Sequence, residues 1–211
     1  VELPKKWGSG SIRGINFDGG LGIIFYQCEF NEAIEIRFVV NEVHPLKYLF
    51  CLEGELNHRF GNHTENHVLL PFQNSMVGSE NHDGHILQFK KGVFTEIFSL
   101  EVDRKKFSNK MNCELQKADA KLKAMFTDVK AKSLFYYQGF YSFILAGLFE
   151  EIKDFNETGL INKIFLEGKA HQILANQLLQ YTDDYNAESE RQLLRQTDVR
   201  AIREAVALIE N

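Results

Sequence analysis

Residues 46–60 read LKYLFCLEGELNHRF, and two short apolar runs in this stretch meet at Glu53 and Gly54. The first run consists of aromatic and aliphatic residues that favour β-structure and has no helical spacing. The second run alternates apolar and polar residues, as a half-buried strand does. Gly54 tolerates the positive φ of a tight turn, so the stretch predicts a β-hairpin.

This hairpin has a definite pairing if Glu53 and Gly54 are its two loop residues. All the residues at alternate positions of the two runs then share one face, because side chains directly opposite each other point to the same side of a sheet. The predicted pairs are Cys51 with Leu56, Leu49 with His58, and Lys47 with Phe60. The shared face is mostly apolar, with one cation and one imidazole.

Composition narrows the class of protein. The 211 residues are 44% hydrophobic, which is enough for a sizeable core, and 24 basic against 29 acidic side chains give a net charge of -5. This balance disfavours nucleic-acid binding by this chain alone. The three cysteines, Cys28, Cys51 and Cys113, indicate neither a disulfide framework nor a thiolate zinc site and fit a reducing cytoplasm. No stretch reaches the roughly 20 apolar residues of a membrane span.

The first half of the chain reads as short strands without helices. Turn residues separate three strand-like runs before the hairpin and three after it. These six runs are residues 11–17, 21–30, 33–40, 66–72, 85–90 and 94–102. Eight short strands predict a β-sandwich or barrel over residues 1–102.

Near Asp103 the hydrophobic period changes from two to 3.6, which predicts a helical region over residues 103–185. Residues 141–152 carry an apolar stripe, and residues 160–181 form a long amphipathic helix. The apolar positions of the long helix proposed for a dimer interface are Ile164, Leu174, Leu178 and Tyr181. Packing against a partner helix and packing wholly inside its own subunit are both open.

The end of the chain predicts one more helix. Residues 182–190 are polar and read as a linker, and a helix then starts at Thr197 or Asp198 with apolar residues on one side. Because this apolar side has nothing to cover it, we expect the natural chain to continue with a basic, helix-rich segment of about 80 to 100 residues.

Together these features resemble the AraC family of bacterial transcriptional regulators, and more narrowly the branch that responds to ferric siderophores. The resemblance is carried by YLFCLEGEL in the β-region, IFLEGKAHQILANQLLQ in the long helix and LLRQTDVRAIREAVALIE at the end. It implies an α+β fold: a cupin-like effector-binding barrel, a helical dimerisation region, and, over residues 186–211, the first helix of a DNA-binding domain. It further implies a homodimer that is not an enzyme, with a small-molecule effector and with DNA contacted only through a segment beyond this chain.

Metal binding can be tested against the cupin resemblance. Where metal-binding cupins hold a glutamate and their second histidine, this sequence has Lys47 and Met76, which are not hard-metal ligands. The pairs His63/His67 and His82/His85 have ligand-like spacing, but loop histidines are usually solvated, so no metal and no cofactor is predicted. Two alternatives stay open: a metal-dependent cupin enzyme, and a sugar or small-acid sensor of the same family.

The predicted hairpin face is the candidate effector site. Its proposed ligand-binding residues are Lys47, Leu49, His58 and Phe60, which would suit an anionic or aromatic effector inside the barrel. The competing interpretation places Lys47 at the rim and makes His58 a core histidine with its hydrogen bonds satisfied.

Trp7 and Arg13 precede or begin the first strand. In the resembled family an amino-terminal arm closes over the effector, which would bring both residues to the site. Alternatively, Trp7 plugs one end of the barrel.

Overall fold

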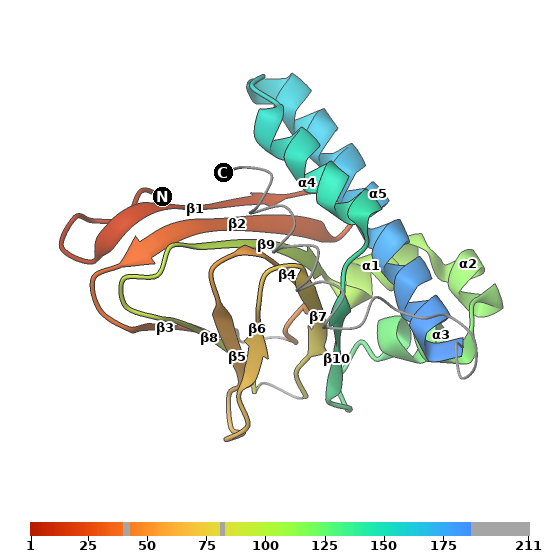
Figure 1. The fold of residues 1–211 in the computed structure, drawn as a ribbon. Helices are drawn as coiled ribbons and strands as arrows, with labels where there is room; N and C mark the ends of the chain where they lie inside the picture. The colour runs from red at the N-terminus through yellow and green to blue at the C-terminus, as the bar shows by residue number, and fades with distance from the viewer. Residues whose placement is uncertain (40–42, 81–82, 187–211) are drawn as a thin grey trace. The chain divides into compact units, whose positions relative to one another are not determined.

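Two antiparallel β-sheets and five helices make up the part of the chain that the computed structural model describes, which is residues 1–39, 43–80 and 83–186. The larger sheet has the strand order β1-β2-β9-β4-β7-β10 and the smaller sheet the order β3-β8-β5-β6 (Figure 1). The strands are β1 (Gly8–Asn16), β2 (Leu21–Phe30), β3 (Ile34–Phe38), β4 (Leu46–Glu53), β5 (Leu56–Phe60), β6 (His67–Leu69), β7 (Gln73–Gly78), β8 (His85–Phe89), β9 (Thr95–Val102) and β10 (Phe135–Phe140). The fold is the predicted α+β arrangement, a cupin-like β-unit followed by helices.

The predicted hairpin between β4 and β5 is wrong. β4 pairs with β9 on one side and β7 on the other, so neither of its edges is left for β5, which pairs with β6 and β8. Gly54 has φ +76°, and the register of the pairing between β4 and β9 shifts between Cys51 and Glu53, just before it. The chain therefore turns out of the larger sheet and enters the smaller one at Gly54.

The main apolar core lies between the two sheets and contains residues of both. Leu49 and Cys51 of β4 pack there in one cluster with Leu56 and Phe60 of β5. The alternation of side chains therefore predicted correctly that these four residues face the interior. The predicted strand pairing was wrong, because β4 and β5 lie in opposite sheets.

Two strands were missed by the sequence analysis. β7 follows directly after the predicted strand over residues 66–72, which contains β6, and is rich in polar residues but almost wholly buried. β10 lies inside the region predicted to be helical and pairs with β7 at the edge of the larger sheet (Figure 1). Part of residues 103–185 therefore belongs to the sheet.

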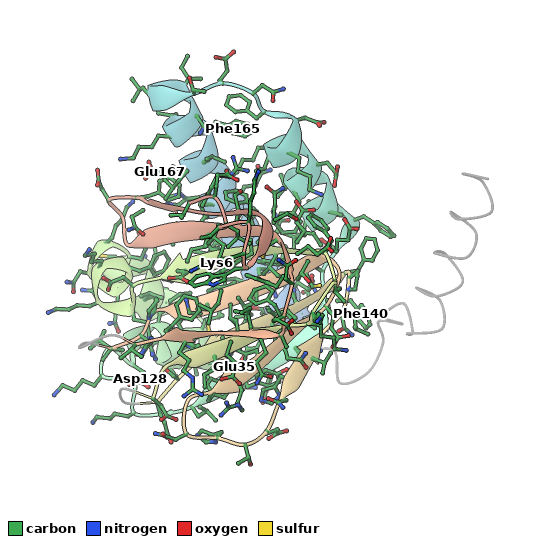
Figure 2. The ribbon with its side chains drawn as sticks, turned by 90° about the vertical axis from the view of Figure 1, so that its left-hand side faces the viewer. Lys6, Glu35, Asp128, Phe140, Phe165 and Glu167 are labelled. Atoms are coloured by element: carbon green, nitrogen blue, oxygen red, sulfur yellow. The ribbon has the colours of Figure 1, made fainter. Side chains whose placement is uncertain are left out.

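The change of period at Asp103 is confirmed. The Asp103 side chain accepts a hydrogen bond from the backbone N–H of Lys106 and caps the first helix. The helices are α1 (Arg104–Lys110), α2 (Asn112–Lys117), α3 (Ala120–Thr127), α4 (Phe143–Asp154) and α5 (Gly159–Asn186). Buried Arg104 pairs with Asp128, labelled in Figure 2, at 3.7 Å and donates to the carbonyl oxygen of His44 at 3.4 Å. These contacts attach the short helices to the start of β4.

Helix α4 packs on the outer face of the larger sheet. The ring of Phe149 lies 5.1 Å from the rings of both Phe50 and Phe98, measured between centroids. Burying an aromatic side chain of this size contributes about 2 to 3 kcal/mol. Ile144, one of the apolar residues of the predicted stripe over residues 141–152, is exposed and not buried.

Helix α5 packs on α4 and reaches β7. Phe165, labelled in Figure 2, stacks on Phe155 with 3.7 Å between ring centroids. Further along α5, Gln177 accepts a buried hydrogen bond from the side-chain amide of Asn74. The helix continues to Asn186, so the predicted linker does not begin at Thr182.

By internal contacts, residues Val1–Gln177 form one compact unit and a second unit begins at Leu178. The helix predicted from residue 197 or 198 lies outside the described residues. None of the described helices is both long and apolar enough to span a membrane.

Candidate functional site: the interior of the β-sandwich

Polar side chains occupy inward-facing positions at one part of the sandwich interior. Along β4 the side chains of Lys47, Leu49 and Cys51 point between the sheets, because strand residues alternate between the two faces. Tyr48 and Phe50 point to the other face, where Phe50 meets helix α4. Interior positions of a sandwich are normally apolar, so Lys47 marks this region as unusual.

Lys47 is paired within the chain. Its ammonium group forms an ion pair with Glu101, its partner residue on β9, and lies 4.2 Å from the ring centroid of Phe38. The residue is only 2% exposed, and burial lowers the pKa of its ammonium group while the charge of Glu101 opposes this shift. The cation that sequence reasoning assigned to a ligand therefore already has a carboxylate partner.

His58 and His85 form a buried pair from the smaller sheet. His58 Nε2 and His85 Nδ1 lie 3.0 Å apart, and the residues are 0% and 1% exposed. Desolvation, with smaller contributions from His67 and Lys47, lowers the pKa of His58 to about 3. Desolvation, together with the neighbouring positive groups, also holds the pKa of His85 well below its usual value. Both imidazoles are therefore neutral near pH 7.

Aromatic rings continue from this pair towards β10. Phe60 has its ring within 6.1 Å of the rings of His58, His85 and His67, between centroids. His67 stacks on Tyr136 of β10 at 3.9 Å, and burial raises the pKa of Tyr136 to about 12. The predicted site residues Lys47, Leu49, His58 and Phe60 thus lie in one interior.

Sequence reasoning missed several members of this site. Glu101 lies 54 positions after Lys47, and only the pairing of β4 with β9 brings the two together. Tyr136 belongs to a strand that was not recognised. His85 begins β8, as the predicted strand over residues 85–90 implies, but it was grouped with solvated loop histidines and is buried instead.

Trp7 and Arg13 are not brought to this interior. Trp7, just before β1, is 53% exposed. Ile12 packs against the core, so its neighbour Arg13 points to the outer face of the sheet, where it donates to the side chain of Gln27 at 3.0 Å. Contact of either residue with an effector stays a prediction.

The four proposed interface residues of α5 differ in exposure. Ile164 is 62% exposed, whereas Leu174 is 4% exposed and covered by its own chain. Leu178 is half-buried and Tyr181 is buried. Leu174 is therefore corrected from a candidate interface residue to a residue of the chain's own packing.

Candidate metal ligands do not gather in the described residues. No group of three His, Cys, Asp or Glu side chains there is arranged to hold a metal ion. His63 lies instead beside Asp83 and Glu80, at 3.6 and 3.8 Å. His82 of the predicted His82/His85 pair lies outside the described residues.

Comparison with known proteins gives one family match. The family described as the regulatory protein PchR N-terminal domain matches residues 8–193. No curated protein sequence matches the chain.

Three solved structures illustrate the structural similarity. Apo ToxT K231A from Vibrio cholerae aligns at 11% identity over 88% of this chain and 65% of its own, with a TM-score of 0.49. The AraC-like transcriptional activator CuxR aligns at 10% identity over 88% and 59%, with a TM-score of 0.48. The cupin domain of an XRE family transcriptional regulator from Enterobacter cloacae aligns at 12% identity over 44% and 94%, with a TM-score of 0.34. The chain thus spans less than two thirds of the ToxT and CuxR chains.

Proposed function

The chain belongs to the family of PchR N-terminal regulatory domains, and from this premise we propose that it binds a small-molecule effector between its two sheets. The observation that supports this location is the set of buried polar groups on the inward faces of both sheets, Lys47 with Glu101 and His58 with His85. Buried polar and charged groups make an apolar interior less stable, so their presence favours a binding role over a purely structural one. The proposed role is regulatory and not catalytic.

A ferric siderophore is the first effector class to test. The support is the sequence resemblance described above and the aromatic side chains of Phe38, Phe60 and Tyr136 around the interior. A carboxylate or phenolate of such a ligand would have to replace Glu101 as the partner of Lys47, because Lys47 is already paired. The side chain of Glu101 is partly exposed, so water could solvate it after such an exchange.

The proposed signal is a shift between two arrangements of the domain. Effector binding favours one arrangement, and the remainder of a longer regulator reads it out on DNA in the cytoplasm. We further propose a homodimer that uses the exposed apolar side chains at the start of α5, which are Leu160, Ile161 and Ile164.

Ligand titration tests this function. A thermal shift measures binding of each member of a panel of ferric siderophores, and the fluorescence of Trp7, the sole tryptophan, is a second readout that responds if the amino-terminal segment moves on binding. We expect one member to bind and Lys47→Met to weaken its binding about ten- to a hundredfold, the effect of losing a charge-assisted contact. Lys163→Met, a change of an exposed lysine on α5, is the control and should leave affinity unchanged.

Two results would contradict the proposal. If no siderophore changes either readout, the effector class is wrong. If a siderophore binds but its affinity is unchanged in Lys47→Met, the binding site lies elsewhere than the sandwich interior.

A further inference from the structure

Four buried side-chain atoms on inward-facing strand positions have no hydrogen-bond partner among the described residues. They are Ser75 Oγ of β7, Ser99 Oγ of β9, His58 Nδ1 of β5 and His85 Nε2 of β8. Each of these residues is at most 1% exposed. Native proteins satisfy the great majority of buried polar groups, so a cluster of unsatisfied ones indicates a missing partner.

The four atoms face one interior from both sheets. Ser75 and Ser99 are the partners of Leu49 on its two sides, so all three side chains point between the sheets. His58 and Leu49 share that interior, because the neighbours of His58 on β5, Leu56 and Phe60, belong to the same cluster as Leu49. The unsatisfied groups therefore all lie on the inward faces of the two sheets.

The histidine pair offers one donor and one acceptor whichever way its internal hydrogen bond runs. If His58 Nε2 donates to His85 Nδ1, then His58 Nδ1 is left as an acceptor and His85 Nε2 as a donor. If His85 Nδ1 donates, the two roles are exchanged. A neutral pair thus always leaves one N–H and one lone pair for an occupant, and each serine hydroxyl adds both functions.

Charge in this interior is already balanced. Lys47 is compensated by Glu101, and the two imidazoles are kept neutral by burial. Unless it displaces Glu101 from Lys47, an anionic group beside the serines and the histidine pair finds no unpaired cation among the named groups and loses its hydration. An uncharged group that both donates and accepts hydrogen bonds has a smaller desolvation penalty, which hydrogen bonds to these four atoms offset.

We propose that Ser75, Ser99, His58 and His85 form a subsite for an uncharged polar group of the effector, such as a carboxamide or an un-ionised phenol. This proposal rests on the proposed function, because it assigns part of the same effector to these residues. The neighbouring rings of Phe60 and His67 would hold the apolar part of that group.

The test compares two nearly isosteric fragments, benzamide and benzoate, on the whole chain with isotope-labelled histidine. A fragment of this size binds with a Kd on the order of 1 mM or weaker. We expect benzamide to shift the imidazole signals of His58 and His85 but not that of exposed His171, and benzoate to bind at least ten times more weakly. Ser99→Ala should weaken benzamide binding about five- to tenfold, while the exposed control Ser133→Ala should not.

Other outcomes would overturn the proposal. Equal or tighter binding of benzoate would show that the site selects an anion. Unchanged benzamide affinity in Ser99→Ala, or no shift of His58 and His85 at all, would leave ordered water as the partner of these groups. If the fragment results contradict the subsite but a ferric siderophore still binds the protein, the subsite is refuted and the proposed function is not. Benzamide binding without any siderophore response would support the subsite and refute only the siderophore as the effector class.

Discussion

Two imidazoles buried inside the sandwich make the stability of the fold depend on pH. His58 and His85 stay neutral in the folded chain but take up protons in the unfolded chain below about pH 6.5. The unfolded state then binds more protons, so the free energy of unfolding falls as the solution is acidified from about pH 6.5 towards the folded pKa. Between pH 7 and pH 5 we expect a loss of roughly 2 kcal/mol per histidine, measured by urea unfolding.

Variants separate this effect from general acid sensitivity. His58→Phe and His85→Phe should each reduce the difference in unfolding free energy between pH 7 and pH 5. His171→Gln, at an exposed position of α5, should leave the difference unchanged. An undiminished difference in both phenylalanine variants would show that other groups cause it.

The ion pair of Lys47 and Glu101 predicts an asymmetric response to substitution. Glu101→Gln leaves an uncompensated ammonium group at a residue that is 2% exposed and should cost about 3 to 5 kcal/mol of unfolding free energy. Lys47→Met leaves a carboxylate that is partly exposed to water and should cost less, about 1 to 2 kcal/mol. Urea unfolding measures both, and equal losses would contradict the buried placement of Lys47.

For single residues, the sequence predicted which side chains point into the interior but not which side chains they contact there. The period-two alternation placed Lys47, Leu49, His58 and Phe60 inside, and it does so for any pairing of the strands. The partners Glu101 and His85 depend on which strands become neighbours, and that is decided by long-range contacts.

Among the elements, two glycines with positive φ should differ in how much their substitution lowers the free energy of unfolding: Gly54 between β4 and β5, and Gly92 between β8 and β9. Gly54 has φ +76°, and an added Cβ would collide with the carbonyl oxygen of Phe94, so Gly54→Ala combines backbone strain with a steric clash. Gly92 has φ +64° with no atom within 4 Å of an added Cβ, so Gly92→Ala adds strain alone. We expect losses of roughly 3 kcal/mol or more for Gly54→Ala and about 1 kcal/mol for Gly92→Ala, measured by urea unfolding. Equal losses would mean that the corner relaxes around the new methyl group.

The two missed strands, β7 and β10, show where the surrounding chain overrides the local sequence preference for helix or strand. β7 reads QNSMVG and has little apolar alternation, yet Asn74 is buried because Gln177 of α5 accepts its hydrogen bond. β10 has strong β-propensity in its FYYQGF run, but it follows three short helices and a region of helical period. The helices α4 and α5 were predicted well because their apolar stripes are long, and their ends moved by only a few residues.

For the whole molecule, the exposure of α5 residues separates an interface from internal packing. Ile164→Glu should convert the proposed dimer into a folded monomer, because its side chain is on the surface of a single chain. Leu174→Glu places a charge in a covered position and should unfold the protein instead. Light scattering measures the mass and circular dichroism the folding. A parent protein that is monomeric at high concentration would refute the proposed dimer.

The position of β10 at the edge of the larger sheet has a consequence for how the chain is made. During synthesis β7 emerges well before its neighbour β10, and the hydrogen bond from Asn74 to Gln177 joins residues 103 positions apart. Until those later residues have left the ribosome, the nascent sheet carries an unprotected edge of the kind that seeds intermolecular strand pairing. A gene fragment ending at Val102 would make that transient state permanent and should yield aggregates, whereas a fragment ending at Asn186 should yield soluble protein.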